Sequence, residues 1–326
     1  MEIDALRARR EERRRAIRRR RRAALVVLAA GLAIVVAIVI LSGRSGASPR
    51  AGARGANAGL LRAEGARRQI HSSSQPRTTA STRSGPPGGE PVPILMYHVI
   101  AAPPAGAPFP GLYVPAQEFS EQMQALKRAG WHAVTLDQVQ AYWRDGVPLG
   151  AGKPIVVSFD NGYQSQYTRA LPVLRRLGWV GDENIQLTGL PPSQGGLGAQ
   201  EVRGLLAAGW ELDTQGISHA SLITLGAREL HDQVALSRAT LQRRYHVAVN
   251  WFCYPSGLYD PTVEAAVRAA GYTGATTVVP GWAHPDEDRY RLHRLRVLGG
   301  TSAQQLLALV QGAREEPPAP GSFTTP

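Results

Sequence analysis

The strongest constraint on the fold is a short apolar segment that is followed directly by polar residues. Residues 155–159 read Ile-Val-Val-Ser-Phe, and Asp160, Asn161 and Gly162 come next. Such a run of β-branched and aromatic residues predicts a buried strand. In barrels of parallel strands, the active site lies at the carboxyl ends of the strands. We therefore expect Asp160 and Asn161 to lie at a functional opening of the sheet.

Strand and helix patterns alternate around this segment. The predicted strands cover residues 91–100, 131–136, 155–159, 210–212, 247–254, 272–278 and 292–297. The predicted helices cover residues 115–129, 137–143, 167–177, 201–208, 227–245, 261–270 and 302–311. This alternation indicates an α/β fold with a parallel sheet and helical crossovers, most simply a single barrel. Residues 180–187, which include Asp182 and Glu183, are interpreted as a solvated loop before a short strand, with acids lining the cleft as the alternative.

The charge of the chain is concentrated at its N-terminus. The net charge is +12, and residues 1–90 hold 19 Arg and 6 acidic residues. Residues 91–326 hold 18 basic and 19 acidic residues and are close to neutral. Proteins that bind nucleic acid carry their basic residues on the folded domain, so this distribution argues against a nucleic-acid partner. The only cysteine, Cys253, excludes an intramolecular disulfide and is expected to be a buried, inert thiol.

An apolar stretch near the N-terminus predicts a membrane anchor. Residues 23–41 contain no charged or polar side chain, and 11 arginines precede them. A helix of that length spans roughly 28 Å, close to the thickness of a bilayer core. Arginines stay on the cytoplasmic side, which predicts a single-pass protein of the cell membrane with its C-terminal part outside the cytoplasm. A cleaved signal peptide is the alternative, although its apolar core is usually shorter.

The chain is thereby divided into five parts. Residues 1–22 form a basic cytoplasmic segment, and residues 23–41 form the transmembrane anchor. Residues 42–90 are rich in Gly, Ala, Ser, Arg and Pro and predict a disordered linker. Residues 91–312 form the folded domain, and residues 313–326 are expected to be a disordered tail.

Six segments of the domain occur in the order known from one enzyme family. These segments are residues 94–98, 119–136, 158–163, 215–219, 252–259 and 292–297. Together they resemble the motifs of the polysaccharide deacetylases, the NodB-homology family or carbohydrate esterase family four. The resemblance implies a distorted (β/α) barrel that removes acetyl groups from amino-sugar polymers of the cell envelope. It also implies a zinc-type divalent metal as cofactor.

The resemblance assigns roles to individual residues. Asp160 takes the place of the general base, and His98 that of a possible general acid. His219 matches a metal-ligating histidine. Tyr254 and Pro255 match residues of the substrate pocket. As a lone histidine on an apolar strand, His98 would otherwise be interpreted as a structural residue.

Two positions depart from the family pattern. Asn161 stands where the family has a ligating Asp, and Gln215 stands where it has a ligating His. Neutral amides are poor ligands for a zinc-type ion, which prefers imidazole, thiolate or carboxylate. Asp213 is a possible substitute ligand, because residues two apart on a strand face the same side.

Two hypotheses about function follow. The first is a membrane-anchored extracytoplasmic deacetylase of a cell-envelope polysaccharide, which would hydrolyse the acetamide C–N bond. The second is a catalytically inactive member of the family that binds glycan or a cell-wall partner. Metal binding near His219 would discriminate between them. The sequence does not define the polymer or the oligomeric state.

Overall fold

The structure is a computed structural model that describes residues 85–190, 195–314, 317 and 319–325. The predicted basic segment 1–22, the predicted anchor 23–41 and most of the predicted linker lie outside these residues. Among the residues described, no helix is long and apolar enough to cross a membrane.

The described domain is built on one curved sheet of eight parallel strands. The strands are β1 (Ile94–Tyr97), β2 (Trp131–Ala133), β3 (Lys153–Asn161), β4 (Asp182–Ile185), β5 (Glu211–Thr214), β6 (Trp251–Cys253), β7 (Gly274–Thr276) and β8 (Leu295–Arg296). Their order is β7-β6-β5-β4-β3-β1-β8, with β2 paired to β3. This parallel sheet confirms the predicted α/β class.

The sheet forms a half-barrel whose two edges are bridged by the segment around β8. On one side, β8 pairs with β1. On the other side, Thr277 N donates to Leu292 O over 2.9 Å, and Arg294 N donates to Val279 O over 3.0 Å. The residues just before β8 therefore reach the edge at β7. This arrangement directs the Arg294 side chain into the interior, toward β3.

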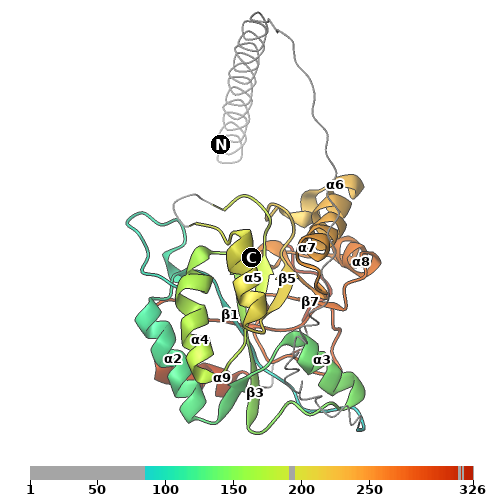
Figure 1. The fold of residues 1–326 in the computed structure, drawn as a ribbon. Helices are drawn as coiled ribbons and strands as arrows, with labels where there is room; N and C mark the ends of the chain where they lie inside the picture. Colours follow the sequence, from blue (N-terminus) through green and yellow to red (C-terminus); the bar gives the residue numbers. More distant parts are fainter. Residues whose placement is uncertain (1–84, 191–194, 315–316, 318, 326) are drawn as a thin grey trace, which may run out of the picture. The chain divides into compact units, whose positions relative to one another are not determined.

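The helices of the described domain are α2 (Ala116–Arg128), α3 (Leu136–Asp145), α4 (Leu171–Leu177), α5 (Ala199–Ala207), α6 (Ala227–His231), α7 (Ser237–Tyr245), α8 (Pro261–Ala269) and α9 (Ala303–Gly312). All of them except α3 lie around the outer face of the sheet. Figure 1 shows α2 beside α4, and α6, α7 and α8 grouped together. One apolar cluster packs Phe119 of α2 and Leu174 of α4 against Phe159, and another packs Val263 of α8 against Phe252.

Helix α3 has a different place, because it closes the end of the half-barrel at the amino ends of the strands. Its Val139 and Trp143 belong to an apolar cluster with Ile94, Val156 and Trp251. Ile94 begins β1 and pairs in register with Val156 of β3. The opposite end, where Asp160 and Asn161 lie, is therefore the one available for a site. We call these the closed end and the cleft end.

The interpretation of residues 180–187 as a solvated loop is wrong, and so is the alternative that their acids line the cleft. Asp182 and Glu183 lie in β4 and are fully buried. Asp182 accepts a hydrogen bond from the backbone N–H of Leu136, the first residue of α3, over 2.9 Å. The amino end of a helix stabilises a carboxylate. Asp182 therefore contacts α3 inside the protein, whereas the sequence pattern predicts that it contacts solvent.

The described part of the predicted tail makes ordered contacts. Phe323 and Tyr259 exchange backbone hydrogen bonds of 2.8 and 2.9 Å. The Tyr259 hydroxyl also donates to the backbone oxygen of Pro320 over 2.6 Å. The sequence gives no sign of these contacts, because the tail has no strand or helix pattern.

Candidate active site

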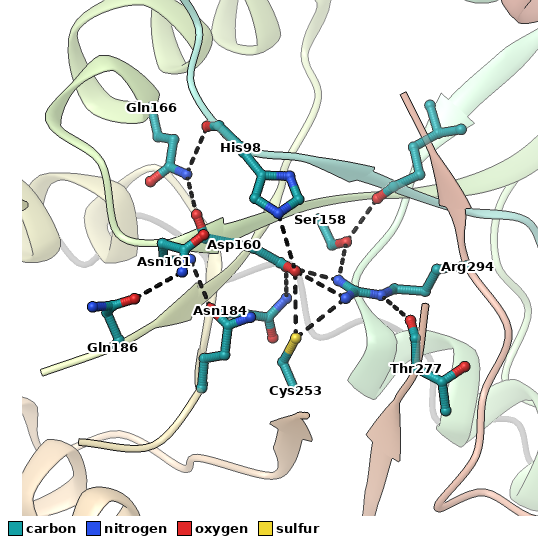
Figure 2. A network of polar contacts seen from close by, with 12 residues as sticks. His98, Ser158, Asp160, Asn161, Gln166, Asn184, Gln186, Cys253, Thr277 and Arg294 are labelled. Carbon is teal, nitrogen blue, oxygen red and sulfur yellow. Dashed lines mark hydrogen bonds and ion pairs between the residues drawn. The ribbon is translucent and has the colours of Figure 1, made fainter. Parts of the chain in front are cut away.

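Asp160 is the centre of a buried polar network at the cleft end (Figure 2). Arg294 binds its carboxylate with two parallel hydrogen bonds, from Nη1 to Oδ1 over 2.7 Å and from Nη2 to Oδ2 over 2.9 Å. Asn184, its partner in register on β4, donates to Oδ1 over 3.0 Å. A bidentate guanidinium–carboxylate pair fixes the carboxylate in both position and orientation.

The charge of Asp160 is balanced within the protein. Burial raises the pKa of this carboxyl, but the charge and hydrogen bonds of Arg294 outweigh burial and lower the pKa to about 2. Arg294 is itself fully buried and donates from Nε to the backbone oxygen of Thr277 over 2.7 Å. Asp160 is therefore an ionised carboxylate at neutral pH, which a general base requires.

His98 follows β1 and points toward Asp160 (Figure 2). Its Nε2 lies 4.0 Å from Asp160 Oδ2. Burial lowers the pKa of His98 to about 4, although the nearby Asp160 charge raises it. Gln166 holds the two strand ends together, because its Nε2 donates to the backbone oxygens of both His98 and Asp160. At neutral pH His98 is an uncharged imidazole beside a carboxylate.

Asn161 ends β3 in a left-handed conformation, with φ of 79°. Asn and Gly adopt this conformation at the lowest cost, and Gly162 follows it with φ of 88°. A Cβ atom on Gly162 would lie 2.6 Å from the Ile185 side chain, so only glycine fits. The Asn161 amide donates to Gln186 Oε1 over 2.7 Å. The sharp turn thus aims the Asn161 side chain at β4.

The other two predicted ligand positions lie after β5. Gln215 Oε1 accepts the backbone N–H of Asn161 over 3.1 Å, so the structure brings these two residues together. His219 is half-buried and has φ of 54°. Burial lowers its pKa, and the charge of Asp160 opposes that effect. His219 is therefore near the Asp160 network.

The structure separates Asp213 from this group. Asp213 points into the half-barrel, where its Oδ1 accepts the backbone N–H of Trp251 over 2.9 Å. It clusters with Asp182 and Glu211, not with His219. Asp213 therefore contributes to the closed end of the half-barrel.

The predicted substrate-pocket residues are part of the packing. Tyr254 is fully buried, stacks on Tyr259 with a centroid distance of 4.9 Å, and donates its hydroxyl to the backbone of Tyr290. Pro255 is also buried. Neither places a free polar group in the cleft. A pocket of about 480 Å³ lies instead beside the end of β4, lined by Gly162, Gln186, Thr188, Arg244 and Tyr245 among others.

The residues at the expected metal position do not fit a zinc-type ion. The three positions supply two neutral amides and one imidazole, and Gln215 Oε1 already accepts a backbone N–H. The carboxylate of Asp160 is occupied by Arg294. Within the described ranges, the only group of three or more His, Cys, Asp or Glu side chains close enough to share an ion excludes His219. We therefore derive no catalytic step through a metal at the cleft.

Sequence reasoning missed Arg294 and Asn184 as members of the site. Arg294 lies in the motif segment 292–297, but it is 134 residues from Asp160 and nothing in the spacing pairs them. Asn184 lies in the segment whose composition predicts a loop. Had that segment been read as a strand beside β3, its register would have placed Asn184 next to Asp160.

Comparison with known proteins identifies the domain. Residues 150–275 match the family model described as polysaccharide deacetylase. This stretch of the domain is therefore of the polysaccharide deacetylase type. YxkH of Bacillus subtilis (strain 168), whose name assigns it to the polysaccharide deacetylases, is 27% identical over 225 residues, which are 68% of this chain and 77% of that protein.

Further matches agree with this family. The poly-beta-1,6-N-acetyl-D-glucosamine N-deacetylase of Escherichia coli (strain K12) is 41% identical over 59 residues, only 18% of this chain and 9% of that protein. Among solved structures, the Streptococcus pyogenes deacetylase PplD has a TM-score of 0.63 at 23% identity, covering 70% of this chain and 100% of that chain. BC0361, a polysaccharide deacetylase from Bacillus cereus, has a TM-score of 0.60 at 23% identity, covering 68% and 69%. At this identity, these structures show a shared fold alone.

Proposed function

We propose that this protein binds acetylated amino-sugar polymers of the cell envelope without deacetylating them by metal-assisted hydrolysis. One observation carries the proposal. The two positions that should supply an anionic and an imidazole ligand hold Asn161 and Gln215, and these bond to the protein itself. A metal lowers the pKa of its bound water only when it is held firmly. His219 alone cannot hold a metal ion firmly.

The substrate class rests on the family and on the pocket. Deacetylases of this family act on acetylated polysaccharides, and the partial match in E. coli is named for a polymer of N-acetyl-D-glucosamine. The pocket beside β4 is lined by Thr188, Arg244 and Tyr245 among others. The Thr188 hydroxyl donates to the backbone oxygen of Ile217 and can still accept a hydrogen bond, and the exposed Arg244 guanidinium can donate, so both suit sugar hydroxyls.

The location of the protein is part of the proposal. The apolar stretch 23–41 and the arginines before it support a single-pass membrane anchor with the domain outside the cytoplasm. A domain held there by a linker meets the envelope polymers directly.

A second candidate function is deacetylation, and one observation favours it. Asp160, Arg294 and His98 form an assembled group with an ionised carboxylate beside a neutral imidazole. Such a pair could move a proton during hydrolysis of an acetamide C–N bond. This candidate requires that water be activated without the family's ligand set.

The two candidates predict different results in one experiment. The full chain is incubated with N-acetylglucosamine oligomers, with and without added zinc or cobalt, and both binding and acetate release are measured. The proposal predicts binding without acetate release, and release only in the double variant Asn161→Asp, Gln215→His. Acetate release by the natural protein that disappears in Asp160→Asn would overturn the proposal in favour of the second candidate. Absence of binding by both proteins would reject glycan recognition.

A further inference from the structure

The closed end of the half-barrel contains three acidic side chains that the cleft does not use. Asp182 begins β4, Glu211 begins β5, and Asp213 lies two residues further along β5. One carboxylate oxygen of each lies within 4.8 Å of those of the other two. Asp182 and Asp213 are fully buried, and Glu211 is half-buried. We call these three residues the acidic triad.

Each carboxylate of the acidic triad is oriented by one backbone N–H. Asp182 Oδ2 accepts from Leu136 and Glu211 Oε2 accepts from Asp137, both at the start of α3 and both over 2.9 Å. Asp213 Oδ1 accepts from Trp251, also over 2.9 Å. Three separate backbone groups therefore hold the three side chains in fixed positions.

The second oxygen of each carboxylate receives no hydrogen bond from a backbone N–H or a basic side chain, although Glu211 lies within hydrogen-bond reach of Asp213 and Thr135. These atoms are Asp182 Oδ1, Glu211 Oε1 and Asp213 Oδ2. A further unpartnered oxygen belongs to the register neighbour of Asp213 on β4. Asn184, which is fully buried and stands beside Asp213 in register, gives its amide hydrogens to Asp160 and leaves Oδ1 without a partner. Buried polar atoms in native proteins nearly always have partners, so these oxygens on neighbouring positions of β4 and β5 point to a ligand.

No basic side chain of the described domain forms an ion pair with the triad, in contrast to Arg294 at Asp160. The amino end of α3 contributes only about half a positive charge. Burial, followed by the charge of Glu211, raises the pKa of Asp182, and burial followed by the charge of Asp137 raises that of Glu211 to about 7. The excess negative charge therefore needs either protons or a cation.

We propose that the acidic triad, together with the amide oxygen of Asn184, binds a hard divalent cation of the Mg²⁺ or Ca²⁺ class. Oxygen-only ligands with several carboxylates are the set that such ions prefer, whereas zinc-type ions prefer nitrogen or sulfur. The ion would join β4, β5 and the start of α3, and so stabilise the closed end. The site is separate from the predicted metal position at His219. It does not depend on the proposed function.

The test measures metal bound to the full chain. The protein is stripped with EDTA, exposed in turn to Mg²⁺, Ca²⁺ and Mn²⁺, and assayed for bound metal and thermal unfolding. We expect about one ion per chain and a higher Tm with the ion present. Asp182→Asn and Asp213→Asn keep an acceptor for the backbone N–H but remove a charge, and each should weaken binding at least about tenfold, as expected when one ligand charge is lost.

The chain offers matched controls. Glu183 is the next residue of β4 and is also fully buried, but it faces the other side of the sheet. Glu183→Gln should bind the ion like the natural protein, and so should His219→Ala. The proposal is overturned if the natural protein binds no ion, if the Asp variants bind as tightly as it does, or if His219→Ala abolishes binding. Because the natural protein is itself tested, Mn²⁺ binding followed by electron paramagnetic resonance decides the matter even if a variant does not fold.

Discussion

Buried carboxylates have different partners at the two ends of the half-barrel. At the cleft end, one carboxylate, Asp160, is held by the guanidinium of Arg294 and stays ionised. At the closed end, three carboxylates have backbone N–H groups as their partners and no basic side chain among the described residues. Both groups lie on strands of the same sheet, Asp160 on β3 and the acidic triad on β4 and β5.

This difference shows which charge the protein itself stabilises. An isolated buried charge is very costly unless it is paired. Arg294 balances Asp160 whether or not a ligand is bound, so the cleft network is complete without a metal. The acidic triad is not balanced by the protein, and it is therefore the better candidate for an ion. The cation site that we propose therefore lies apart from the metal position that the sequence predicts at His219.

Removal of Arg294 tests the cleft end and should have the largest effect. Arg294→Met keeps most of the side-chain volume but leaves Asp160 buried without a cation. We expect a loss of about 3–5 kcal/mol in the free energy of unfolding, measured by urea denaturation.

Two variants control this result. The double variant Asp160→Asn, Arg294→Met removes both charges and should recover part of the lost stability. Arg144→Gln removes an exposed arginine paired with Asp145 and should leave stability unchanged. If Arg294→Met costs less than about 1 kcal/mol, Asp160 is not stabilised by Arg294 as described.

The pH dependence of stability tests His98. Its folded pKa is about 4 and its unfolded pKa is about 6.5. Between these values the unfolded chain binds more protons, so stability is present above pH 6.5 and is lost as the pH falls toward 4. The contribution is on the order of 3 kcal/mol. Urea denaturation from pH 7 to pH 4 should show a clearly smaller loss for His98→Gln, and equal losses in both proteins would contradict the burial of an uncharged His98.

A substitution at the start of α3 tests the closed end, and we expect it to change the free energy of unfolding least. The Thr135 hydroxyl accepts the backbone N–H of Gln138, and the Gln138 side chain accepts that of Thr135. Thr135→Ala should cost about 1 kcal/mol of unfolding free energy. Ser302→Ala removes the same kind of cap from α9, which packs against α2. We expect Thr135→Ala to cost more than Ser302→Ala, and the reverse order would mean that α3 does not organise the closed end.

Most elements of the fold could be predicted from local pattern. The helix predicted over 115–129 is α2, and the strand predicted over 155–159 is the central part of β3. The predicted helix 227–245 is continuous in the structure, as α6, a π-helical turn and α7. These segments bury apolar residues at regular spacing, so the spacing in the sequence predicts which residues are buried.

The buried polar residues could not be predicted in the same way. Asp182 and Glu183 give β4 the composition of a loop. The residue that hydrogen-bonds Asp182 in its buried position, Leu136 at the amino end of α3, lies 46 residues earlier in the chain, so the local pattern does not reveal it. Arg294 and Asp160 are 134 residues apart and meet only because the half-barrel is bridged at β8. Asp160, Asn161, Gln215 and His219 were found from motif positions, but their hydrogen-bond partners come from tertiary structure.

The central proposal is that the cleft of this deacetylase-type domain does not bind a zinc-type ion tightly. Calorimetric titration of zinc into the full chain and into the double variant Asn161→Asp, Gln215→His tests it most directly. Zinc prefers the nitrogen ligands of the cleft to the oxygen ligands of the closed end, and His219→Ala reports which site is filled. The account predicts that only the double variant binds zinc tightly, and that it does so through His219. Binding by the natural protein at micromolar affinity, lost in His219→Ala, would contradict it.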